Sequence, residues 1–119
     1  MRLLLAVVLL VSCARSSRPR TVDASVVFAK RAGGGELIDG RIHCESTRAD
    51  EIACSLSHEG DASVTVCFHV ELTCRNGNRA SAESCRMTAP GTEVRTLHSA
   101  EGCDAIEDGR VTDAWTIDR

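Results

Sequence analysis

The chain has 119 residues, a length typical of a single domain. Its 17 acidic residues outnumber its 14 lysines and arginines, and the formal net charge of −3 argues against a nucleic-acid-binding protein, which normally carries a basic stripe. Aromatic residues make up only 3% of the chain, so a core of smaller side chains would gain from covalent cross-links, which seven cysteines could supply.

The first twelve residues have the pattern of a signal peptide. A positive start at Met1-Arg2 precedes an apolar run over residues 3–11. As a helix this run would reach only about 14 Å, against a hydrocarbon core of about 30 Å, so it is too short to span a membrane. Its length suits the apolar segment of a signal peptide, which we predict over residues 1–12.

A lipid-attachment motif follows. Leu10-Val11-Ser12-Cys13 resembles the lipobox of bacterial lipoproteins. The resemblance implies cleavage between Ser12 and Cys13, diacylglycerol on the Cys13 thiol and usually an acyl chain on the new amine. Ala14 stands where lipoproteins of the inner membrane typically carry aspartate, which implies the outer membrane of a Gram-negative host, on its periplasmic or surface face. The alternatives are an ordinary secretory signal with a coincidental cysteine, and a buried N-terminal strand.

Residues 13–21 are predicted to be the lipid-bearing cysteine and a flexible tether, because they are polar and show no periodicity. Arg15, Arg18 and Arg20 fit a solvated tether, with weak attraction to anionic lipid head groups as the alternative. We therefore expect the protein to meet the membrane through its N-terminal lipid.

Setting Cys13 aside leaves an even number of cysteines: Cys44, Cys54, Cys67, Cys74, Cys85 and Cys103. Export places them in an oxidising compartment, so three disulfides are expected, with fifteen connectivities open. The alternative is metal binding, with the four histidines as further ligands: His43, His58, His69 and His98. Only the Cys67-x-His69 pair suggests it, and the absence of any C-x-x-C pair favours disulfides.

Alternating apolar residues and turn signals predict a chain of short strands. They fall at residues 21–28, 37–44 with a kink near Gly40, 51–56, 63–73, 79–88, 92–97 and 111–117. No segment carries a sustained helical period. The expected fold is all-β: a small antiparallel β-sandwich of seven or eight strands over residues 22–119, immunoglobulin-like in outline, with a small closed barrel as the alternative.

Two cysteine pairs gain support from the expected hairpins. Cys44 and Cys54 flank a turn and could face each other across it. Asn76-Gly77 is favourable hairpin chemistry, because both residues tolerate the positive φ of tight turns. A three-residue loop at 75–77 would place Cys67 opposite Cys85, whereas a two-residue loop would turn them to opposite faces.

The segment from residue 60 to residue 98 also resembles known proteins at the level of its pattern. A long cysteine-bearing strand over residues 63–74, the Asn76-Gly77 turn, Cys85 and Pro90-Gly91-Thr92 are similar to small bacterial lipoproteins and to the FxLYD-type sandwich. The FxLYD motif itself is absent. The resemblance implies a family of unknown function with no established catalytic residues.

The expected function is a non-enzymatic, membrane-tethered binding or structural module at the cell envelope, without a cofactor and with an envelope protein of unknown identity as partner. Its interaction surface would be the loops at 45–50, 57–62 and 99–109, because sandwiches present function on loops. The first alternative is an exported inhibitor of a lysozyme or protease, and the second a metal-binding or hydrolytic protein. The acidic clusters at Asp50-Glu51 and 104–108, the latter with Asp104, Glu107 and Asp108, instead suggest solvated loop charge.

Overall fold

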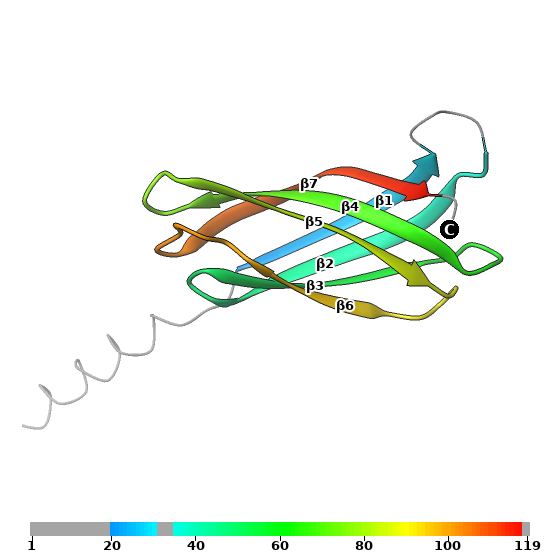
Figure 1. Ribbon diagram of the computed structural model, residues 1–119, viewed down its shortest axis with the longest axis horizontal. Coiled ribbons are helices and arrows are strands. Elements are labelled where there is room, and N and C mark those ends of the chain that lie inside the picture. Colours follow the sequence, from blue (N-terminus) through cyan, green and yellow to red (C-terminus); the bar gives the residue numbers. More distant parts are fainter. Residues whose placement is uncertain (1–19, 31–34, 118–119) are drawn as a thin grey trace, which may run out of the picture.

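The computed structural model describes residues 20–30 and 35–117, which form seven strands and no helix (Figure 1). The strands are β1 Thr21–Lys30, β2 Ile38–Arg48, β3 Glu51–His58, β4 Val64–Cys74, β5 Arg79–Thr88, β6 Val94–Ser99 and β7 Ile106–Ile117. The prediction of an all-β fold of about seven strands is confirmed. Within the described ranges no helix is long and apolar enough to cross a membrane. The leader, the Ser12–Cys13 cleavage site and the tether up to residue 19 lie outside those ranges.

The seven strands follow the order β5-β4-β7-β1-β2-β3-β6. Strand β1 joins the two halves of this sheet, because it runs antiparallel to β2 over residues 21–28 and then parallel to β7 at Ala29 and Lys30. The half with β2, β3 and β6 packs against the half with β4, β5 and β7, and Figure 1 shows the two layers. The result is a small, nearly closed β-sandwich whose edge strands are β5 and β6.

The core lies between these two layers and follows from the alternation of the strands. Apolar residues two apart point to the same face, and β2 and β4 bury theirs in a regular series. Phe28 and Phe68 are fully buried, and the surrounding side chains are mainly Val, Ile and Leu. The two phenyl rings are therefore the largest fully buried side chains, and the core around them is mainly aliphatic.

Gly40 lies where the predicted kink falls, and the structure explains why no side chain is tolerated there. A Cβ at this position would overlap the ring of Phe28 and lie 2.5 Å from the carbonyl oxygen of Ser57. We expect Gly40→Ala to lower the free energy of unfolding by about 1–3 kcal/mol, the usual cost of overpacking. Urea denaturation measures this loss. The matched control is Asp39→Ala, an exposed neighbour in the same strand, which should leave the midpoint nearly unchanged.

The three expected interaction loops are shorter than the sequence suggested. Strand β2 continues to Arg48, β3 to His58, and β7 begins at Ile106, so the loops are 49–50, 59–63 and 100–105. The prediction of long loops at 45–50, 57–62 and 99–109 was wrong because polar runs can pair as strands when their side chains face solvent. β6 is likewise displaced, from the expected 92–97 to Val94–Ser99.

Hydrogen bonds gather four chain segments at one end of the sandwich. Arg20 and Ser46 exchange two hydrogen bonds at the start of β1, and the amide of Ala100 donates to Asp50. The amide of Arg75 donates to Ala105, so the β4–β5 loop belongs to the same end. In Figure 1 this is the end at which the chain enters the sandwich. The loops 59–63 and 89–93 lie at the opposite end.

Candidate functional site

All six cysteines after residue 20 form disulfides: Cys44–Cys54, Cys67–Cys85 and Cys74–Cys103. Cys44 and Cys54 are a directly opposite pair of β2 and β3, as the sequence allowed. Cys67 lies opposite Cys85 because the β4–β5 loop spans residues 75–77, the loop length required for that pairing. The third bridge, which no pattern predicted, joins the end of β4 to the loop before β7.

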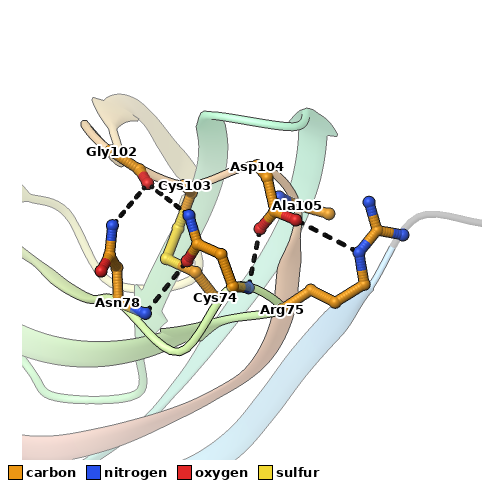
Figure 2. Close-up of a disulfide and its surroundings, with 8 residues drawn as sticks. Cys74, Arg75, Asn78, Gly102, Cys103, Asp104 and Ala105 are labelled. Carbon is orange, nitrogen blue, oxygen red and sulfur yellow. Dashed lines mark hydrogen bonds and ion pairs between the residues drawn. A yellow bond between two sulfur atoms is a disulfide. The ribbon is translucent and has the colours of Figure 1, made fainter.

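This third bridge closes a compact structure that we call the locked tip, made of residues 75–78 and 100–105 (Figure 2). The side-chain amides of Asn76 and Asn78 both donate to the carbonyl oxygen of Gly102, at 3.0 and 2.9 Å. The backbone amide of Asn78 donates in turn to the Asn76 side chain. Two segments far apart in the sequence are thus held together by one covalent bond and several hydrogen bonds.

Asp104 accepts a second group of hydrogen bonds in the locked tip. Its carboxylate accepts hydrogen bonds from the backbone amides of Asn76 and Ala105, both at 2.9 Å, and from the Nε–H of Arg75 at 3.3 Å. Desolvation raises the pKa of Asp104, but these hydrogen bonds and the charge of Arg75 outweigh it and hold the pKa below its usual value. The carboxylate therefore organises the loop and is engaged on both oxygens.

The rest of the predicted acidic clusters does not assemble around Asp104. Glu107 and Asp108 lie within β7, and the Asp108 carboxylate accepts from the amide of Gly109. Glu51 pairs with Arg48 across the β2–β3 turn. These contacts agree with the interpretation of the acidic residues as exposed charge.

The four histidines are distributed over the sandwich. His43 is exposed on β2 beside Asp23, and His69 lies on the outer face of β4 near Thr112. Cys67 is bonded to Cys85, so no Cys67-x-His69 thiolate site forms. Among the described residues, no group of three or more His, Cys, Asp or Glu side chains is placed to hold a metal ion.

His58 is a buried structural residue at the end opposite the locked tip. Its Nδ1 accepts from the amide of Gly60 at 3.0 Å, so the proton of the neutral ring lies on Nε2, which donates to the carbonyl oxygen of Thr88 at 2.7 Å. The ring thereby ties the end of β3 to the end of β5 on the opposite layer. Its two ring nitrogens are both used in this link.

His98 lies half-buried on β6, where its ring meets Phe68 edge-on at a centroid distance of 5.9 Å. Burial, and to a smaller extent the charge of Arg86, lower the pKa of His98 below 6.5. The folded state therefore favours the neutral ring. The resulting contribution to the free energy of unfolding is fully present above pH 6.5, and it is lost as the pH falls through the lowered native pKa.

We accordingly expect the thermal midpoint to fall as the pH drops below 6.5 and His98 becomes protonated. His98→Gln removes the titrating ring, so part of this decline should disappear in that variant. Thermal unfolding followed by circular dichroism at a series of pH values measures the difference. Identical pH profiles for the two proteins would contradict the assignment.

A hollow of about 490 Å³ lies beside the locked tip, on the outer face of β4, β5 and β7. Charged and polar side chains dominate its lining: His69, Glu71, Thr73, Arg79, Asp108 and Arg110. Two of these lining residues, Glu71 and Arg110, form an ion pair at 3.8 Å. The sequence did not predict this hollow, because it depends on which outward residues of three non-consecutive strands become neighbours.

No protein-family model, no curated protein and no solved structure matches the chain.

Proposed function

We propose that the protein is a lipid-anchored, non-catalytic binding module of the cell envelope, and that the locked tip is its recognition surface. The observation that carries the proposal is the tip itself, where a disulfide and a set of side-chain-to-backbone hydrogen bonds fix two loops in one conformation. Several of their residues are nevertheless exposed, among them Arg75 and Glu101. The polar hollow beside the tip extends this surface.

Pre-organisation is the physical reason for choosing this surface. A flexible loop loses conformational entropy when a partner orders it, at a cost of about 0.5–1.5 kcal/mol for each immobilised side chain. At the locked tip the Cys74–Cys103 bridge and the contacts of Asp104 already order the two loops during folding, so that less conformational entropy is lost on binding. More of the contact energy is then left to appear as affinity.

The partner is expected at the same membrane surface. The locked tip lies at the end of the sandwich where β1 begins, and Arg20 is hydrogen-bonded to Ser46 at this end. Residues 14–20 separate this end from the proposed lipid on Cys13, and a link of that length spans at most about 25 Å. The opposite end is about 40 Å farther away, the length of a twelve-residue strand such as β7. A tethered module would therefore present the tip to membrane-proximal proteins.

Affinity capture from envelope extracts tests the proposal, with the lipidated protein as bait. Two charge reversals at exposed positions provide a matched comparison: Glu101→Arg on the locked tip and Glu93→Arg in the loop at the opposite end. We expect a defined partner on the unmodified bait, at least about tenfold less of it on Glu101→Arg, and no loss on Glu93→Arg. Equal capture by all three baits, or capture of no protein, would refute this use of the tip.

An inhibitor of a lysozyme or protease is the second candidate, and the same rigidity favours it, because inhibitory loops bind in one fixed conformation. A purified soluble domain that slows such an enzyme, with the slowing weakened in Glu101→Arg, would identify this form of binding. Full enzyme activity at saturating domain concentration would exclude the enzymes tested.

A further inference from the structure

The three disulfides differ in how far solvent reaches them. Cys44 and Cys54 are fully buried in the core. At the locked tip Cys74 is 2% exposed and Cys103 is partly exposed. In the remaining pair, Cys67 is fully buried whereas Cys85 is exposed.

The Cys67–Cys85 bridge also differs from the core bridge in its place on the sheet. Val66 and Phe68 point into the core, so Cys67 between them points to the outer face, and Cys85 lies directly opposite. Strand β5 is the last in the sheet order, so no further strand of that sheet covers Cys85. A small molecule or another protein can approach this residue from the sheet edge.

The opposite side of the bridge is closed. Cys67 has Trp115 of β7 as its second directly opposite neighbour, and Trp115 is only 5% exposed. Thiol–disulfide exchange requires a thiolate to reach one sulfur from the side opposite its bonded partner. For Cys85 that side is the open edge, and for Cys67 it is occupied by β7.

We propose that Cys67–Cys85 is a thiol-exchange site, at which a protein dithiol of the exported compartment attacks the Cys85 sulfur. The incoming thiolate forms a mixed disulfide with Cys85, the Cys67–Cys85 bond breaks, and the Cys67 thiolate takes a proton from water. The second thiol of the dithiol then attacks the dithiol sulfur that is bonded to Cys85. This closes the disulfide of the dithiol and releases Cys85 as a thiol. Two electrons pass from the dithiol, which becomes a disulfide, to the cysteine pair, which becomes two thiols.

We expect the fold to persist when the Cys67–Cys85 bridge opens, because other links between the strands remain. Cys44–Cys54 still ties β2 to β3, and Cys74–Cys103 still closes the locked tip. The backbone ladder between β4 and β5 runs from Val64–Thr88 to Thr73–Arg79 and does not depend on the bridge. This exchange site is independent of the proposed binding function, because the proposed recognition surface, the locked tip, lies at the other end of β4 and β5.

Partial reduction of the native full chain tests the proposal. The protein is treated with a dithiol reductant for increasing times, alkylated in denaturant so that buried thiols are also labelled, and mapped by mass spectrometry. We expect Cys67 and Cys85 to be labelled at least about tenfold faster than the other four cysteines, with an increase in the fluorescence of Trp115, the one tryptophan of the chain, as the neighbouring disulfide opens. Simultaneous labelling of all six cysteines, or earlier labelling of either other pair, would overturn the assignment.

Two single variants form a matched pair that tests which sulfur is attacked. Cys67→Ser leaves the exposed Cys85 as a free thiol, and Cys85→Ser leaves the buried Cys67. We expect an aromatic disulfide reagent to react with Cys85 at least about tenfold faster than with Cys67, and the rates to converge in denaturant. Equal rates in the folded state would overturn the assignment of Cys85, and the reduction experiment on the unaltered chain remains decisive if either variant fails to fold.

Discussion

Export of the chain without Cys13 is expected to move the protein from the membrane fraction to the soluble fraction. The altered protein carries a conventional cleavable leader and serine at position 13, followed by residues 14–119. Each buried methylene contributes about 0.8 kcal/mol, so two or three acyl chains hold a protein firmly on a bilayer. The three arginines of the tether would contribute only about 1 kcal/mol each at an anionic surface.

Fractionation with a high-salt wash measures this release. The unaltered protein should stay with the membranes and the altered protein should wash off, while both retain the three disulfides in non-reducing mass analysis. The bridges should persist because Cys13 is not one of the six cysteines that pair. A serine variant that remains on salt-washed membranes would exclude lipid on Cys13 as the anchor.

Removal of the Cys74–Cys103 bridge is expected to cause the largest loss of stability among the three disulfides. It closes the longest loop, with a sequence separation of 29 against 18 for Cys67–Cys85 and 10 for Cys44–Cys54. The entropy of loop closure gives a loss of about 3–4 kcal/mol for Cys74→Ala/Cys103→Ala. This is a large fraction of the 5–15 kcal/mol typical of a domain.

Urea denaturation measures the global loss, and amide hydrogen exchange locates it. We expect faster exchange at residues 75–78 and 100–105, because only hydrogen bonds then hold the two loops together. The matched control is Cys67→Ala/Cys85→Ala, which should cost slightly less and leave protection at the locked tip unchanged. Equal protection of the tip in both double variants would show that the bridge does not fix its conformation.

Local sequence signals predicted most of the strands and limited one hairpin to two alternative registers. Strand β4 shows strict alternation, so its inward face could be assigned before the structure was known. The three-residue loop at 75–77 was one of these alternatives, and the structure has it together with the register that places Cys67 opposite Cys85. Both inferences rest on residues close in sequence, where strand period and turn geometry are sufficient.

The candidate site could not be predicted in the same way. Cys103 lies in a loop without periodicity, so nothing local indicates Cys74 as its partner. Asp104 was recognised only as part of an acidic cluster, whereas its role depends on the backbone amide of Asn76, which tertiary packing brings within reach. The placement of the tip beside the start of β1 likewise depends on the order of all seven strands.

Site-specific photo-crosslinking in living cells tests the central claim most directly, because it asks which surface of the anchored protein meets a partner. One photoreactive residue replaces Glu101 on the locked tip, and in a matched protein it replaces Glu93 at the opposite end; both positions are exposed. We predict a discrete cross-linked envelope protein from position 101 and none from position 93. Cross-links from position 93 alone, or no cross-link from position 101 in a correctly anchored protein, would contradict the account.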